Sequence, residues 1–274
     1  MKNYIARDPA GIMRYGFLYK KTHLVQILDF VRKALEDSHS SNEEHAGVAT
    51  LGILVAIFEN MFGVIGAHLP ELLNILFQEL NHQHYYLDSA TVPFMSMLLQ
   101  AISMAFACCP GLAFQWLTDN DSILKVFQLW FSHMGHFQKE LELRRMIFGL
   151  TAIIKTASSD FPMILQLQLP EIMSQLATFT LRLHRQRENE DYVYNEPNDD
   201  NSVYKSHLDS VDPIAILQDA LIAVEKDRPQ FYRKMMAGVS RELQAELIKA
   251  FSEVHSIERY RQSQLEGLEE PLVE

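Results

Sequence analysis

The stretch ELRRMIFGLTAIIK, Glu142–Lys155, sets two adjacent arginines directly before a nearly continuous run of apolar side chains. The run predicts a helix that is buried nearly all round. The positive charges of Arg144 and Arg145 lie near the start of this helix, where the helix dipole disfavours cations and favours the nearby Glu140 and Glu142. We therefore expect both arginines to have partners elsewhere in the protein.

Helical periodicity continues on both sides of this stretch. His23–Leu35, for example, is apolar at positions that recur every three or four residues. No run alternates apolar and polar residues as a half-buried strand does, and no Asn-Gly or Asp-Gly hairpin turn is present. The other expected helices cover residues 43–63, 70–80, 91–109, 112–117, 123–134, 140–156, 169–185, 213–226, 229–237 and 240–260.

Neighbouring helices alternate in character. His23–Leu35 and residues 70–80 are amphipathic, whereas residues 43–63 and 91–109 are apolar on more of their surface. This alternation, with a pair period of about forty to fifty residues, is typical of stacked HEAT-type helical hairpins. We predict an all-α fold of the α-α superhelix class, a HEAT/armadillo-like solenoid, with a compact helical bundle as the structural alternative.

In such a stack, Arg144 and Arg145 are candidates for structural charge contacts between repeats. They would meet acidic groups of the next repeat at the edge of the stack, where long side chains reach water.

The helical pattern breaks once, at Arg187–Asp212, which reads RENEDYVYNEPNDDNSVYKSHLDSVD. This acidic segment holds eight carboxylates against one arginine and one lysine, so we expect a flexible loop. The predicted organisation is a HEAT-repeat segment over residues 1–186, the acidic segment over 187–212, C-terminal HEAT-type helices over 213–260 and a charged tail over 261–274. Ser240 is the expected N-cap of the last helix.

The acidic segment is the main candidate for binding a partner. A flexible negative surface would attract a basic protein, such as a histone or a ribosomal protein, and the attraction would weaken with salt. The alternative is a solvated linker between helices. The formal net charge of the chain, −11, also favours a basic partner and disfavours nucleic acid. The candidate protein-binding residues are Glu188, Glu190, Asp191, Glu196, Asp199 and Asp200.

No set of residues predicts catalysis, a cofactor or a metal site. Cys108 and Cys109 are adjacent and lack a second paired-cysteine motif, so we expect two buried thiols in a reducing compartment and no zinc. His82 and His84 would not share one face of a helix. No glycine-rich phosphate loop is present. Asp160, His184 and His207 make no convincing catalytic set with any serine.

Several stretches, in this order, resemble a known family. They are HLVQILDFVRKAL (His23–Leu35), EEHAGVATLGILVAIFEN (Glu43–Asn60), LPELLNILFQEL (Leu69–Leu80), FQLWFSHMGHFQKELELRRMIFGLTAII (Phe127–Ile154) and VDPIAILQDALIAVEKDRPQFYRKMMAGVSRELQAELIKAF (Val211–Phe251). Together they are similar to the C-terminal part of nuclear transport receptors of the importin-β superfamily, in particular the importin-7 and importin-8 group. The family's loop is often a long run of Asp and Glu, whereas the acidic segment here is short and interleaved with Asn, Tyr and Ser.

The resemblance implies a non-enzymatic receptor that imports protein cargo through the nuclear pore under the control of the GTPase Ran. Such a protein is found in the cytoplasm, in the nucleus and at the nuclear envelope. The chain would be the last part of the receptor, as a fragment or a truncated gene product, and would contact cargo and a partner such as importin-β. Ran and the phenylalanine-glycine repeats of nucleoporins would bind mainly through the full-length receptor.

Two other interpretations stay open. One is a HEAT-repeat scaffold subunit of a regulatory or chromatin complex, and the other, disfavoured by the missing catalytic set, is a helical-bundle enzyme. We expect no direct contact with nucleic acid or membrane. Six aromatic residues would either fill the core or, as the resemblance implies, line grooves for nucleoporin phenylalanines, and for Trp130 we expect the core. They are Phe58, Phe62, Phe77, Phe127, Trp130 and Phe131.

Overall fold

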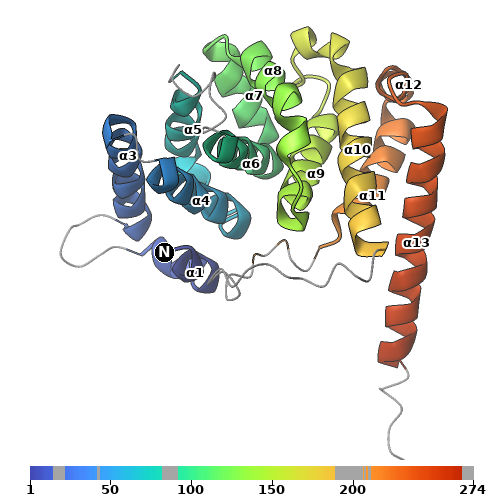
Figure 1. Ribbon diagram of the computed structural model, residues 1–274, viewed down its shortest axis with the longest axis horizontal. Coiled ribbons are helices and arrows are strands. Elements are labelled where there is room, and N and C mark those ends of the chain that lie inside the picture. The colour runs from blue at the N-terminus through green and yellow to red at the C-terminus, as the bar shows by residue number, and fades with distance from the viewer. Residues whose placement is uncertain are drawn as a thin grey trace, which may run out of the picture.

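The computed structural model describes residues 1–14, 22–41, 44–81, 92–188, 206, 208 and 211–266. Within these ranges the chain forms thirteen α-helices and four short 3-10 helices, and no strand (Figure 1). The predicted all-α class is therefore confirmed. The α-helices are α1 (Lys2–Arg7), α2 (Pro9–Ile12), α3 (His23–Ser41), α4 (Glu44–Asn60), α5 (Leu69–Gln78), α6 (Val92–Cys108), α7 (Pro110–Asp119), α8 (Ile123–His133), α9 (Glu140–Lys155), α10 (Leu169–Glu188), α11 (Pro213–Asp227), α12 (Pro229–Met236) and α13 (Arg241–Glu266).

The expected helices are all present, with ends that differ by a few residues in most cases. The two largest differences are of equal size: α3 continues past Leu35 to Ser41, and α13 continues past residue 260 to Glu266, into the range expected as a charged tail. Residues 261–266 contain good helix formers and no Gly or Pro, which explains the extension. Ser240 caps α13 as predicted, since its hydroxyl accepts a hydrogen bond from the Leu243 amide at 3.2 Å.

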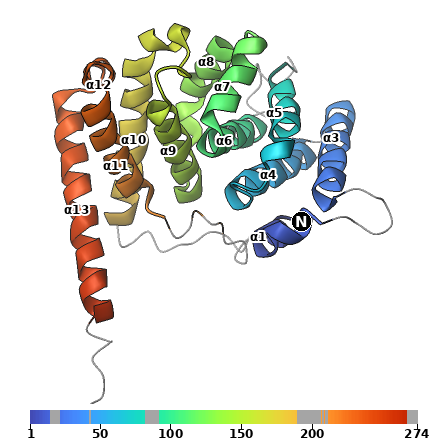
Figure 2. The ribbon, with the colours of Figure 1, turned by 180° about the vertical axis from the view of Figure 1, so that it is seen from behind.

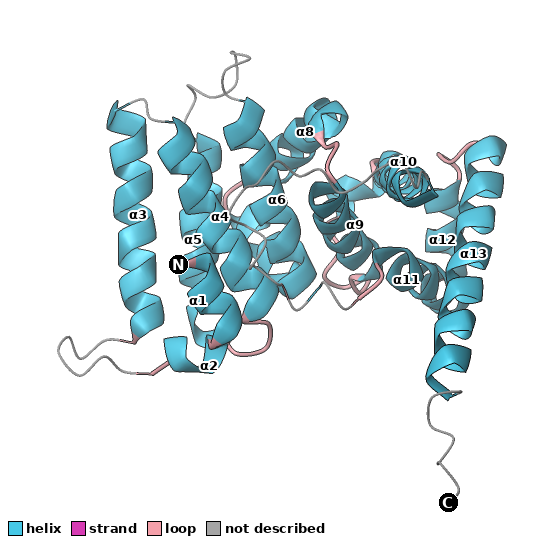
Figure 3. Cartoon of the chain, turned by 60° about the horizontal axis from the view of Figure 1, so that its bottom comes forward, coloured by secondary structure: helices cyan, strands magenta, loops and turns pink. Residues whose placement is uncertain are grey.

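The helices pack in two rows. Helices α4, α6, α9 and α11 pack side by side in that order and form what we call the inner row (Figures 1 and 2). Helices α5, α7, α8, α10 and α12 lie along one side of this row, α3 and α13 lie at its two ends, and α1 packs on α4 (Figures 1 and 3). The two most apolar helices, α4 and α6, belong to this row, where neighbouring helices cover them on several sides.

The inner row contains a buried charge. Arg145 of α9 is only 7% exposed, and its Nε donates to Oε1 of Glu59 in α4 at 2.6 Å. Its Nη1 donates to Oε1 of Gln100 in α6 at 2.7 Å. One side chain therefore joins three helices. Its position differs from the expected water-accessible edge, because the apolar faces of α4, α6 and α9 close around it.

Helices α6 and α9 also approach each other closely. A Cβ atom on Gly149 of α9 would lie 2.1 Å from Oγ and 2.5 Å from the backbone oxygen of Ser103 in α6. The same serine hydroxyl donates to the backbone oxygen of Arg145 at 2.7 Å. Glycine at position 149 thus permits the contact that brings Arg145 within reach of its partners.

The C-terminal end of α9 is held by a second arginine. Arg228, between α11 and α12, donates to the backbone oxygens of Thr156 at 2.6 Å and Ile154 at 2.8 Å. These carbonyls have no partner within the helix, so a guanidinium is well suited to satisfy them. The guanidinium also lies 4.6 Å from the ring centre of Phe231 in α12. These contacts fasten α12 to the inner row.

Among the described helices, none is by itself long and apolar enough to cross a membrane. Only α6 and α7 together pass by length and composition, and the two are bent by 119° where they meet.

Replacing Arg145 with methionine should lower the free energy of unfolding by about 3–5 kcal/mol, because Glu59 would keep a buried charge without its partner. The exposed pair between Arg185 and Glu246 provides the control, and Arg185→Met should cost under about 1 kcal/mol. Urea denaturation measures both. The double variant Glu59→Leu with Arg145→Met should recover part of the loss. Equally small losses of unfolding free energy in R145M and R185M would contradict the assignment of Arg145 and Glu59 as a buried ion pair.

Glu79, in the 3-10 helix Glu79–Asn81, should make stability depend on pH. Burial raises its pKa to about 7 from 4.5, and its Oε2 lies 2.8 Å from Nε2 of His39. Between pH 4.5 and about pH 7 the folded protein therefore keeps the Glu79 carboxyl protonated, whereas the unfolded chain has lost this proton. The free energy of unfolding consequently falls as the pH rises through this window. Glu79→Gln should remove this fall and be more stable than the wild type at pH 8 by up to roughly 3 kcal/mol. Urea denaturation at pH 5 and pH 8 tests this, and a gain that is the same at both pH values would refute it.

Candidate functional site

The acidic segment is only partly visible. Glu188 is the exposed last residue of α10, whereas Glu190, Asp191, Glu196, Asp199 and Asp200 lie outside the described residues, as do His82, His84 and His207. The part played by the six carboxylates in binding therefore stays a prediction. The structure describes the two ends of the segment, residues 187–188 at the start and residues 206, 208 and 211–212 at the return.

The two ends of the acidic segment are tied together. Arg187 donates from Nη1 to Oδ2 of Asp212 at 3.2 Å and from Nη2 to Oε1 of Glu140 in α9 at 3.3 Å. Asp212 in turn caps α11 by accepting a hydrogen bond from the Ile214 amide at 2.8 Å. The segment thus leaves and rejoins the fold at one place, beside the start of α9.

Arg144 fixes the returning end of the segment. Its Nη2 donates to the backbone oxygens of Leu208 at 2.6 Å and Val211 at 3.3 Å, and its Nη1 lies 3.7 Å from Oε1 of Glu140. The adjacent arginines Arg144 and Arg145 therefore make contacts with different parts of the fold. Arg145 turns into the inner row, while Arg144 holds the acidic segment against it. Whether these contacts join successive repeats stays a prediction.

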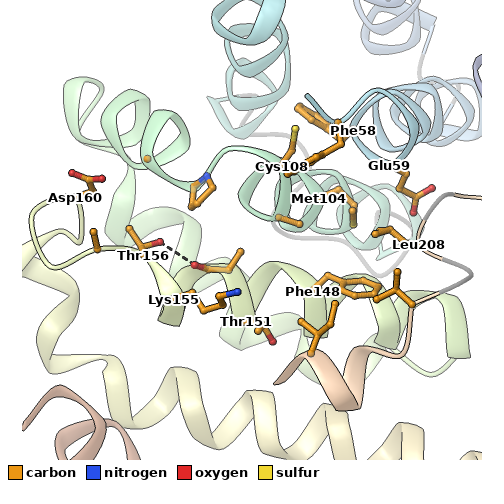
Figure 4. Close-up of a pocket in the computed structure, with 18 residues that line it drawn as sticks. Phe58, Glu59, Met104, Cys108, Phe148, Thr151, Lys155, Thr156, Asp160 and Leu208 are labelled. Carbon is orange, nitrogen blue, oxygen red and sulfur yellow. Dashed lines mark hydrogen bonds between the residues drawn. The ribbon is translucent and has the colours of Figure 1, made fainter. Parts of the chain in front are cut away.

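A pocket of about 620 Å³ opens beside the returning end of the acidic segment, which Arg144 holds (Figure 4). The inner row contributes most of its wall, and the returning end of the acidic segment contributes Leu208 and Val211. Its volume is within the range of pockets that bind a large side chain or a small molecule. The other lining residues are Phe58, Glu59, Phe62, Met104, Ala107, Cys108, Pro110, Gly111, Phe148, Thr151, Ala152, Lys155, Thr156, Ala157, Asp160 and Ile216.

The wall of the pocket is mostly apolar, with few polar groups. Exposed Lys155 and Asp160 lie toward one end, and Glu59 lies toward the other, where Arg145 neutralises it (Figure 4). The Thr151 hydroxyl is buried and has no hydrogen-bond partner among the described residues. An apolar wall with a few convergent polar groups is the usual form of a binding pocket. It suits an apolar anchor side chain that carries or adjoins a polar group.

The six aromatic candidates divide into core and surface. Phe58, Phe77, Phe127 and Trp130 are at most 1% exposed, which places Trp130 in the core as expected. Phe131 is partly buried against the core. Phe62 is different, because it follows the end of α4, lines the pocket and is 59% exposed. A large exposed aromatic at the rim of an apolar pocket is a typical feature of protein-binding surfaces.

The two cysteines are half-buried free thiols, less enclosed than the sequence led us to expect. Cys108 lines the pocket. A hydrogen bond from Cys109 lowers the pKa of Cys108, and the same contact together with burial raises the pKa of Cys109. We therefore expect Cys108 to be the more reactive of the two thiols.

No protein-family profile, no curated protein and no solved structure matches this chain. The assignment of this site therefore depends on its geometry. Sequence reasoning identified Arg144, Arg145 and the acidic segment, but it did not place them beside a pocket. One sequence feature could have identified Phe62 as an exposed residue, namely that Gly63 follows it directly after the apolar run of α4. Glycine permits a sharp turn here, and this turn leaves Phe62 outside the core.

At neutral pH, iodoacetamide should alkylate Cys108 faster than Cys109, because the thiolate is the reactive form. Cys109→Ala removes the hydrogen bond that lowers the pKa of Cys108, so this variant should react more slowly at Cys108. Fragmentation mass spectrometry of the peptide that holds both cysteines measures the two rates. Equal rates in the wild type, or faster reaction at Cys109, would show that the assignment is wrong.

Proposed function

We propose that this chain is a non-enzymatic protein-binding segment whose inner row and acidic segment together hold a basic protein. The observation that carries this proposal is the position of the acidic segment, whose returning end is tied by Arg144 and forms part of the wall of the apolar pocket. The arrangement of helices in two rows supports a HEAT/armadillo-type α-α superhelix, in which the inner row is the concave binding face.

Recognition would have two parts. The carboxylates of the acidic segment attract a positively charged partner over about 8–10 Å, which raises the association rate and is screened by salt. The pocket then takes an apolar side chain of that partner, with Phe62 covering it from the rim. Apolar burial supplies the short-range part of the affinity and is much less sensitive to salt. The two parts are therefore separable by experiment.

We propose further that the partner is cargo for nuclear import, and that the chain belongs to a transport receptor of the importin-β type. The resemblance of the five stretches named above supports this proposal, and so does the net charge of −11, because histones and ribosomal proteins are basic. In this proposal, control by Ran, contacts with nucleoporins and any contact with importin-β depend mainly on the full-length receptor.

The proposal is tested by the binding of a fluorescent core histone across a salt series, measured by anisotropy with a chelator present. The amide variant replaces the six candidate carboxylates of the acidic segment with Gln or Asn. It should bind more weakly at low salt and lose most of the salt dependence. Phe62→Ala should weaken binding roughly 10-fold at every salt concentration, because an exposed aromatic at an interface contributes about 1–2 kcal/mol.

Phe30→Ala is the matched control, since Phe30 on α3 is 50% exposed and does not line the pocket. It should bind as the wild type does. Circular dichroism shows that each variant is folded. Binding that is absent in the wild type, or is unchanged in both the amide variant and F62A, would refute the proposed site.

A further inference from the structure

Three potential metal ligands gather between α10 and α13, away from the pocket. His184 and Glu188 lie one helical turn apart on α10, and Glu253 projects from α13. Nε2 of His184 lies 3.0 Å from Oε2 of Glu253 and 3.6 Å from Oε1 of Glu188. The three ligand atoms all lie within 4.8 Å of one another.

These distances fit the coordination sphere of zinc. With bonds of about 2.0–2.1 Å, the ligand atoms of a tetrahedral site are separated by about 3.3–3.4 Å. The two distances from the imidazole lie on either side of this value. The ligand types also fit, because zinc is bound by neutral imidazole and by carboxylate, and two carboxylates balance its charge. Water would complete the fourth position on the exposed side.

The histidine is enclosed in a way that points to a ligand. Its side chain is 12% exposed, and its buried Nε2 faces two carboxylates, Oε2 of Glu253 at 3.0 Å and Oε1 of Glu188 at 3.6 Å. An imidazole nitrogen and carboxylate oxygens that converge in a partly enclosed site are ligand types that zinc takes. A metal ion at the centre of the cluster would bond to Nε2 and both carboxylates at once.

Lys249 occupies the position of a competing cation. Its ammonium lies 3.6 Å from Oε1 of Glu188 and 3.5 Å from Oε1 of Glu253. The side chain is 65% exposed, so it is free to turn into solvent when a divalent ion takes its place. The cluster thus already holds a cation by electrostatic attraction.

We propose that His184, Glu188 and Glu253 bind a zinc ion that fastens α13 to α10. Helix α13 is the last of the fold and runs beyond the end of α10 (Figure 1). Glu188 is also the last residue of α10, directly before the region outside the described residues. Zinc would therefore hold the terminal helix and the departing end of the acidic segment together. This inference does not depend on the proposed protein-binding function.

Zinc uptake by the chelator-treated chain, measured by competition with a chromophoric chelator, tests the site. The wild type should bind one zinc ion at this site and melt at a higher temperature with zinc than without it. Glu253→Gln and His184→Gln should each weaken that binding by at least roughly 10-fold and abolish the shift in melting temperature. Lys249→Met should tighten binding by roughly 2- to 5-fold, because it removes a competing charge.

Glu246→Gln is the matched control, because Glu246 also lies on α13 and pairs across to α10 through Arg185 but is outside the cluster. It should bind zinc as the wild type does. Glu253→Gln keeps the test valid if His184→Gln fails to fold. No zinc uptake by the wild type at micromolar free metal would overturn the proposal. Uptake that is equal in the wild type and E253Q would also overturn it, and would assign the binding to other histidines such as His133 and His136.

Discussion

The guanidinium of Arg145 is the constraint on which the arrangement of the inner row depends. A buried charge is tolerated only when it is paired and hydrogen-bonded, and here the acceptors come from two other helices, Glu59 of α4 and Gln100 of α6. The three helices must therefore keep one register relative to one another. The absence of a side chain at Gly149 and the small side chain of Ser103 allow the approach that this register requires. The same register brings the ends of α4, α6 and α9 together around the pocket. An interaction that belongs to the core in this way determines the shape of the proposed binding surface.

The neighbouring arginine links this core to the returning end of the acidic segment. Arg144 binds backbone oxygens of the acidic segment, and Arg187 pairs with Asp212 across its two ends. The structure places the two ends of this segment beside the apolar pocket. In the proposed binding of a basic protein, the carboxylates of the segment would supply the attraction and the pocket would supply the apolar contact.

The helices were predictable because their signals are local. Apolar periodicity and prolines near helix starts, as at Pro70 and Pro229, identified them to within a few residues in most cases, and Ser240 marked the start of α13. The partners of Arg145 were not predictable, because Glu59 is distant in sequence and many other carboxylates were available. The short helices α1 and α2 lack a clear apolar period and were missed.

Phe58 and Phe62 look equivalent in the sequence, yet Phe58 is 1% exposed and Phe62 is 59% exposed. The difference arises because α4 ends at Asn60 and Gly63 turns the chain with φ of 77°. Likewise, His184 and Glu188 share a helix face, but only the packing of α13 adds Glu253.

The most direct test of the central claim, that the pocket side of the inner row binds a basic protein, is hydrogen exchange of this chain with and without a bound core histone. Binding at the proposed site should slow exchange at the end of α4 near Phe62, in the C-terminal half of α9 and at residues 206–211, while α3 and the middle of α10 keep their rates. This pattern would place the partner over the pocket and the returning end of the acidic segment. Protection confined to α3, α5 or α10, with the pocket side unchanged, would contradict the account.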